Sequence, residues 1–152
     1  MADYPIAEMI LQNVVATIKL IDVEDGYYTS VRNVKPFETG PFDPPYPVAG
    51  IYVSFDRAAD VQDYVFNQRE MFVNIEYWLQ EQVPGNKATE LQCAIADIQR
   101  AMLTVDNNRG GHAIQTILED VQPFVTDVED IFGAIVGFRI HYRFQYGEPS
   151  LP

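Results

Sequence analysis

The chain has 152 residues, of which 47% are hydrophobic and 12% aromatic, and its 10 Lys and Arg against 22 Asp and Glu give a formal net charge of −12. This length and apolar content exclude a disordered chain and predict a single domain over residues 1–152 with its own core. The negative charge argues against general nucleic-acid binding, because the chain repels phosphates. Cys93 is the one cysteine, which excludes an intrachain disulfide, and we expect it to be a small buried hydrophobe.

The sequence shows neither a targeting signal nor a membrane span. No basic segment leads into an apolar run near the N-terminus, so we expect no secretory signal. No apolar run approaches the ~20 residues that a membrane-spanning helix needs. We therefore expect a soluble protein that matures where it is made.

The first half of the chain predicts one helix followed by three strands. Apolar residues spaced by three and four predict a helix over residues 5–21. Residues 28–34 are rich in β-forming residues, and residues 48–55 and 70–80 have strand-like patterns, so each is predicted to be a strand.

Two segments between these strands are predicted to be loops. Five of the ten prolines lie between Pro36 and Pro47, where each fixes the backbone, and the loop also carries Phe37, Phe42 and Tyr46. We expect a stiff loop that either reaches a partner or packs on its own domain. Residues 56–69 fit no pattern and are expected to form a polar loop. The weak helical spacing in them involves Val61, Tyr64 and Val65.

The second half predicts a helix and two strands. Apolar residues from Leu91 to Met102 predict a helix with Asn86 as a plausible N-cap, ending near the sequence DNNRGG. Residues 112–122 are predicted to be a short strand and residues 123–130 a turn.

The closing stretch AIVGFRIHYRFQYGEPS, residues 134–150, alternates with period two, which predicts a long strand. Its even residues, up to Tyr146, are apolar and are expected to face the core. Arg139, His141 and Arg143 occupy odd positions and are expected on the other face, where the cations could meet acids of a neighbouring subunit or remain solvated.

The order of elements predicts an α+β fold. We expect a mostly antiparallel sheet of about four to six strands packed against two main helices. This fold class says nothing by itself about activity.

No motif for catalysis, a metal or a cofactor is present. Neither His112 nor His141 has a Cys, His or carboxylate at zinc-ligand spacing, and the hydrolase, NTPase and dinucleotide motifs are missing. The acids between Glu119 and Asp130 lack the spacing of a calcium loop, so we expect a solvated acidic edge. We expect no catalytic, metal or cofactor-binding residues and no enzyme activity.

The sequence DNNRGGHA, residues 106–113, allows two interpretations. Gly110 and Gly111 permit positive φ and are expected to form a structural turn after the second helix. The alternative is a phosphate cradle with Arg109 nearby.

Three stretches, PPYPVAGIYVSFD, ATELQCAIADIQRAMLTVDNNRGGHA and FRIHYRFQYGEP, together resemble the tail terminator (tail-completion) proteins of long-tailed bacteriophages. That family has a proline-led strand, a helix that ends in Asp and a Gly-Gly pair, and a Tyr-rich closing strand. Here these features correspond to Pro47–Phe55, Ala88–Ala113 and Phe138–Pro149. Residues 56–69 have no counterpart in the pattern.

The resemblance implies a structural virion protein at the head-proximal end of the tail, assembled in the host cytoplasm. Such proteins form a homo-oligomeric ring, usually a hexamer, that caps the tail tube, stops its polymerisation and joins a neck or head-completion protein. DNA would only pass through the lumen, no membrane would be bound and no cofactor would be needed. Candidate contacts with a neighbour or the tube are Arg139, His141, Arg143, Phe37, Phe42 and Tyr46.

Two other functions stay open at this point. One is another phage ring component, either a tail-tube or a head-tail connector protein. The other is an α+β enzyme or ligand-binding module whose site carries no recognised motif.

Overall fold

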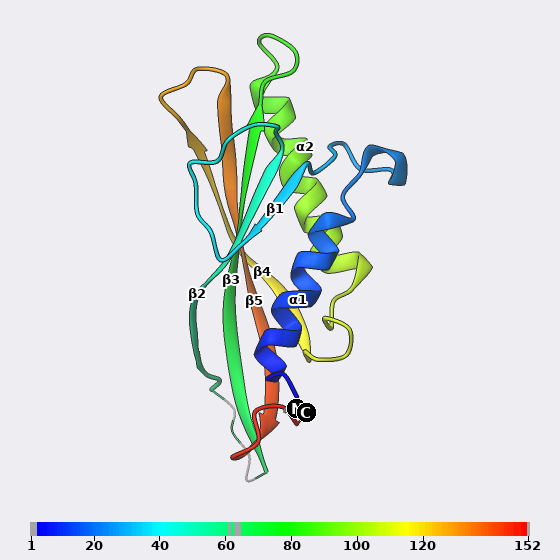
Figure 1. Cartoon of the computed structure of the whole chain (residues 1–152), viewed down its shortest axis with the longest axis vertical. Coiled ribbons are helices and arrows are strands. Elements are labelled where there is room, and N and C mark those ends of the chain that lie inside the picture. Colours follow the sequence, from blue (N-terminus) through cyan, green and yellow to red (C-terminus); the bar gives the residue numbers. More distant parts are fainter. Residues whose placement is uncertain (1–2, 61, 63–64, 152) are drawn as a thin grey trace.

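A computed structural model describes residues 3–60, 62 and 65–151 (Figure 1). Five strands form one sheet in the order β1-β2-β3-β5-β4, and two helices, α1 (Ile6–Lys19) and α2 (Lys87–Arg100), lie on one side of it. The β1–β2 pair is parallel and the other three pairs are antiparallel. The predicted α+β class, with a mostly antiparallel sheet against two helices, is confirmed.

The strands differ greatly in length. The two longest, β3 (Phe66–Gln80) and β5 (Ile131–Gln145), pair with each other over their whole length in the middle of the sheet. Next to β3 lies β2 (Val48–Ala58), and next to β5 lies β4 (Gln115–Val125). The four-residue β1 (Asn33–Pro36) covers only the first part of β2.

The core lies between the sheet and the helices. Alternate residues of β3 and β5 point into it, because side chains of a strand alternate between its two faces. The helices contribute residues spaced by three and four. Core residues with no more than 1% exposure include Ile10, Val14, Ile18, Met71, Val73, Ile75, Ile98, Met102, Val136, Phe138 and Ile140.

The closing strand has the two faces that its sequence predicts. From Phe132 to Tyr142 the even residues are buried. The prediction is wrong at Tyr146, which follows the strand and is 53% exposed. The strand passes the end of α1 there, and the chain turns back so that the Pro149 carbonyl accepts a hydrogen bond from the Ile6 N–H at 2.8 Å, which brings the two termini together (Figure 1).

Both ends of the segment 56–69 are strands and not the polar loop that its sequence suggests. The strand β2 continues to Ala58 and β3 begins at Phe66, so residues 56–58 and 66–69 extend the β2–β3 hairpin. Its polar residues pair across the strands, as Arg69 Nε does with Asp56 Oδ1 at 2.8 Å. Paired polar side chains suit a strand without a continuous apolar face. Val61 and Tyr64, part of the weak helical spacing, lie outside the described residues.

The predicted strand at residues 28–34 is displaced, since β1 begins only at Asn33. The buried carboxylate of Asp97 on α2 holds the preceding residues instead. It accepts hydrogen bonds from the N–H groups of Tyr28 and Thr29 at 2.9 and 2.7 Å and from the Thr29 hydroxyl at 2.7 Å. These backbone donors are therefore satisfied by a side chain and not by a strand.

Three smaller predictions about the second half need correction. Asn86 is at the N-cap position of α2 but makes no side-chain cap hydrogen bond, and Cys93 is half-buried. After Arg100 the helix continues as a π-helical turn, Ala101–Val105. The strand β4 includes Pro123, which was predicted to start a turn; an edge strand tolerates a proline because one row of its N–H groups needs no partner.

Replacing Asp97 with Ala tests the link between α2 and residues 28–29. We expect a loss of about 3 kcal/mol in the free energy of unfolding, because two backbone donors and a hydroxyl lose their acceptor in a site that is 2% exposed. Chemical denaturation measures this loss. The exposed Gln92→Ala on the same helix is the control, and an equally small effect of both substitutions would contradict the assignment.

Candidate assembly surfaces

The face of the sheet opposite the helices carries a row of alternating charges. Arg57 Nη2 lies 3.0 Å from Glu70 Oε2, Arg139 Nη1 lies 3.6 Å from Glu70 Oε1, and Arg139 Nε lies 2.9 Å from Glu119 Oε1. The row crosses β2, β3, β5 and β4. Two Arg and two Glu alternate in it, so the charges balance within the chain.

The other two predicted contact residues of β5 are also on this face. His141 Nε2 and Gln68 Oε1 are 3.1 Å apart, and the Arg143 guanidinium lies 4.2 Å from the centre of the Phe66 ring. The structure therefore places Arg139, His141 and Arg143 together on one face, as the sequence predicts. Each already has a partner in its own chain, and contact with a neighbouring subunit remains a prediction.

A shallow groove of 340 Å³ runs beside the charged row. Its wall includes the stacked rings of Phe55 and Phe72, whose centres are 4.2 Å apart, and Arg57 lies 5.1 Å over the Phe72 ring. At the floor of the groove, Gly137 has no side chain, and the Asp120 carboxylate occupies the space beside it. A Cβ added to Gly137 would lie only 2.3 Å from Asp120 Oδ1. The groove combines apolar rings with uncharged and acidic groups.

The proline-rich loop folds back over the other part of this face. Phe42 is 7% exposed and meets Trp78 edge to face at 5.8 Å. The Tyr46 hydroxyl donates to the Phe42 carbonyl at 2.6 Å. Phe37, in contrast, is 64% exposed and has a φ of 59°, a rare conformation for a bulky side chain. The loop thus packs on its own domain through Phe42 and leaves Phe37 available for contact.

Sequence reasoning missed Glu76 and Trp78, which hold this loop. Glu76 Oε1 accepts hydrogen bonds from the Gly40 N–H at 3.0 Å and from Trp78 Nε1 at 2.7 Å. An acid and an aromatic residue two positions apart in a strand share a face, and that spacing was the available signal.

Gly110 and Gly111 form a turn, with φ values of 68° and 88°. The Asp106 carboxylate accepts hydrogen bonds from the Gly110 N–H at 2.8 Å and from Asn13 Nδ2 on α1 at 2.9 Å. Burial acts to raise the pKa of Asp106, but these hydrogen bonds outweigh it and hold the pKa below its ordinary value of 3.8. The turn therefore also ties the end of the second helical segment to α1.

The structure argues against a phosphate cradle at this turn, because the cation that it would need, Arg109, is enclosed. Arg109 is 0% exposed, and its guanidinium donates to the Met102 carbonyl and to Met102 Sδ. Burial lowers the pKa of Arg109. A guanidinium enclosed in this way satisfies the π-helical turn and does not face a ligand in solution.

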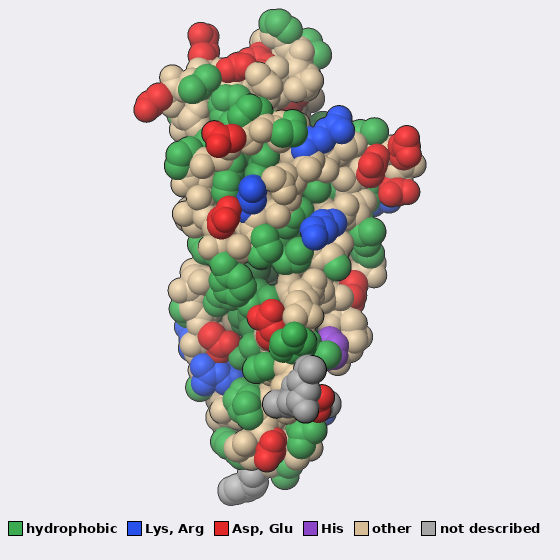
Figure 2. Space-filling view, viewed as in Figure 1, with side chains coloured by type: hydrophobic (Ala, Val, Ile, Leu, Met, Phe, Trp, Pro, Cys, Tyr) green, Lys and Arg blue, Asp and Glu red, His purple; other side chains and the backbone are tan. Residues whose placement is uncertain are grey.

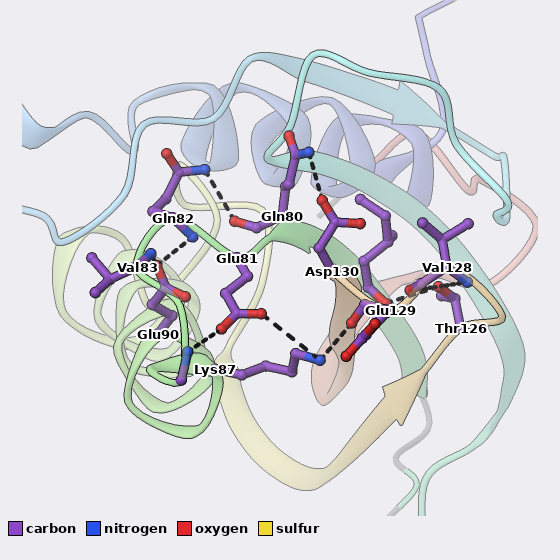
Figure 3. Close-up of polar contacts among 12 residues, drawn as sticks. Gln80, Glu81, Gln82, Val83, Lys87, Glu90, Thr126, Val128, Glu129 and Asp130 are labelled. Atoms are coloured by element: carbon purple, nitrogen blue, oxygen red, sulfur yellow. Dashed lines mark hydrogen bonds and ion pairs between the residues drawn. The ribbon is translucent and has the colours of Figure 1, made fainter.

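Residues 80–87 and 126–130 lie at one end of the molecule and include the acids Glu81, Asp127, Glu129 and Asp130 (Figure 1). Lys87 Nζ donates to the Glu129 carbonyl and lies 4.0 Å from Glu81 Oε2, and Gln80 Nε2 donates to Asp130 Oδ2 at 2.9 Å (Figure 3). These contacts join the β3–α2 loop to the β4–β5 turn. The predicted solvated acidic edge is thus partly a set of hydrogen-bond acceptors.

Among residues 3–60, 62 and 65–151, no group of three or more His, Cys, Asp or Glu side chains is arranged to hold a metal ion. No helix within this part of the chain is long and apolar enough to span a membrane. A groove of 410 Å³ lies between residues 23–32 and α2 and includes Cys93. Its carboxylate, Glu90, accepts hydrogen bonds from the N–H groups of Gln82 and Val83.

The Asp106 hydrogen bonds predict a pH-dependent stability. The pKa of Asp106 is lowered in the folded protein. The carboxylate therefore adds its full contribution to the free energy of unfolding above the unfolded pKa, and this contribution is lost as the pH falls through the folded pKa. The difference in unfolding free energy between the wild type and Asp106→Asn should therefore shrink as the pH falls from about 5 to about 3. Urea denaturation across this range measures it, and a constant difference would contradict the assignment.

The proline-rich loop predicts opposite outcomes for its two phenylalanines. Phe42→Ala should cost about 3 kcal/mol in unfolding free energy and shift the fluorescence of Trp78, because the ring is buried against the indole. Phe37→Ala, the matched control, should change stability by less than about 0.5 kcal/mol, because its ring is exposed. Equal losses would show that Phe37 also packs on the domain.

The comparisons with known proteins bear on this fold. No protein-family profile matches the chain, and no curated protein matches it. A solved structure described as "Virion of native gene transfer agent (GTA) particle" contains a chain that is similar in structure, with a TM-score of 0.50 and 12% sequence identity. The similarity covers 88% of this chain and 91% of that chain. At this identity it shows that the two chains share a fold.

Proposed function

We propose that this protein is a structural virion component of the tail terminator type. In this role a ring of the chain, most simply a hexamer, caps the tail tube, stops its polymerisation and joins the tail to a neck or head-completion protein. The observation that carries the proposal is the shared fold with a chain of the gene transfer agent virion over nearly the whole of both chains. The resemblance of three sequence stretches to tail terminators supports the same role independently.

The surfaces suit a protein that works by contact. The charged row on the open face is balanced within the chain, so that face is neither strongly attractive nor repulsive to a partner. Phe37 and the acidic end made by residues 80–87 and 126–130 are exposed features on which a tube or neck protein could bind. Phe37 sits on a loop that is otherwise fixed by Phe42, so it loses little entropy on docking.

The net charge of −12 has a use in such a ring. Acids that line a lumen repel DNA phosphates, so DNA in transit would slide without binding. In this proposal DNA is a passing substrate of the assembled virion and not a ligand of the chain.

Another ring component of a phage tail, either a tube or a connector protein, is the second candidate. The fold similarity supports it as well, because the description of the matched structure names the particle and no component. The two roles differ in how the protein polymerises.

Electron microscopy of the purified protein with assembled tail tubes tests the proposal. We expect discrete rings, alone or at one end of each tube, and tubes that no longer elongate once the ring is bound. Phe37→Ala should reduce the fraction of capped tubes while leaving the fold intact, because it removes an exposed aromatic contact. Long stacks formed by the protein alone would instead identify a tube component, and rings that never bind a tube end would favour a connector.

A further inference from the structure

Three of the 10 Lys and Arg residues have no charged or aromatic partner within the part of the chain that the structure describes. Among the described residues, Lys19, Arg32 and Lys35 have no ion-pair partner and lie over no aromatic ring, whereas the other cations make such contacts or donate to backbone atoms. Arg32 and Lys35 belong to one edge of the sheet, at β1. Figure 2 shows Lys and Arg side chains gathered on the side that carries β1 and the upper end of α1.

The opposite edge of the same sheet, at β4, carries the reverse charge. Asp120 and Asp127 are exposed, and residues 115–130 contain no Lys or Arg. Beside them Val125 is 82% exposed and Val128 is 57% exposed. This edge is thus an acidic surface with an apolar centre.

The two edges are level with each other across the sheet. Register pairs connect Asn33 through Val48, Trp78 and Gly133 to Phe124. In the same way Lys35 connects through Gly50, Glu76 and Ile135 to Gln122. Arg32 is therefore level with Val125, two residues before Asp127, and Lys35 is level with Gln122, two residues after Asp120.

This geometry points to an edge-to-edge contact between copies of this chain. We propose that the β1 edge of one copy binds the β4 edge of the next, with Arg32 facing Asp127 and Lys35 facing Asp120. Each offset is about two residues of a strand, roughly 7 Å, which the long Lys and Arg side chains can span. The aliphatic stem of Arg32 covers the exposed Val125. The inference rests on the proposed function, because it names the subunit interface of that ring.

The equal level of the two edges favours a ring over a filament. A contact between two different patches closes into a ring only when each copy is rotated relative to the last without a shift along the axis. When the contact joins residues at the same level of the sheet, each copy is shifted little along the strand direction relative to the previous copy. Pro36 and Pro123 each lack an N–H group, so side chains and not a continuous backbone ladder make the contact.

Two charge-reversal variants test the contact. R32E/K35E makes both edges acidic, and D120K/D127K makes both edges basic. Each variant alone should lose assembly by at least about 100-fold in apparent affinity, because like charges face each other at every contact. Mixing the two should restore rings in which they alternate, since every contact then joins an acidic to a basic edge. Native mass spectrometry at low ionic strength measures all three samples.

A matched control and two further readouts keep the result interpretable. E24K/D25K makes the same change in net charge as D120K/D127K but lies on the loop after α1, and it should assemble like the wild type. Circular dichroism checks folding; if a reversal variant is unfolded, Arg32→Gln with Lys35→Gln replaces it and should weaken assembly. High salt should weaken wild-type assembly, because it shortens the range of charge interactions to about 3 Å at 1 M.

The outcomes separate this inference from the proposed function. Three outcomes would each overturn the edge-to-edge contact. The reversal variants could assemble like the wild type, their mixture could fail to assemble, or the wild type could stay monomeric at high concentration. If the reversal variants cap tube ends as well as the wild type does, the terminator role is kept and the ring interface lies elsewhere. If charge reversal abolishes the rings and mixing restores them, but no ring caps a tube, the edge-to-edge contact is kept and the terminator role is rejected.

Discussion

The pairing of β3 with β5 is the interaction on which the rest of the structure depends. Fifteen consecutive register pairs, from Phe66 and Gln145 to Gln80 and Ile131, join the two strands in the centre of the sheet. Because both strands alternate in the same register, alternate residues from Met71 to Leu79 and from Phe132 to Tyr142 form one buried, mostly apolar face, and the opposite, more polar face carries Glu70 and Arg139. The apolar face fixes where α1 and α2 pack. The polar face positions the charged row, and the proline-rich loop packs against it through Trp78.

A long, narrow sheet with helices on one face leaves three surfaces for contact: the open face and the two edges. The charges of the row on the open face form ion pairs within the chain, because Arg57 and Arg139 alternate with Glu70 and Glu119. Exposed ion pairs of this kind add only about 0–1 kcal/mol each to stability. Their larger effect is on the choice of partner, because a face whose charges are matched offers little net attraction. Among the described residues, Arg32 and Lys35 lie at the β1 edge without an ion-pair partner, and the exposed Asp120 and Asp127 lie at the β4 edge.

Polar and charged side chains hold loops in place: Asp97 fixes residues 28–29, Asp106 fixes the glycine turn against α1, and Arg109 fills the π-helical turn. These contacts hold each loop within its own chain, and such preorganisation lowers the entropy that association must cost.

The sequence by itself determined the fold class, α1, the core of α2, the long closing strand and its two faces, because periodic apolar residues encode which side of an element is buried. It placed Arg139, His141 and Arg143 on one face and predicted the turn at Gly110 and Gly111. Only the tertiary structure decided how those cations are used, since their partners Glu70, Glu119 and Gln68 come from other strands. It also decided that residues 56–58 and 66–69 extend the β2–β3 hairpin and that residues 28–29 bind Asp97. Such contacts join residues 13 to 73 positions apart, and no local pattern specifies which distant donor meets which acceptor.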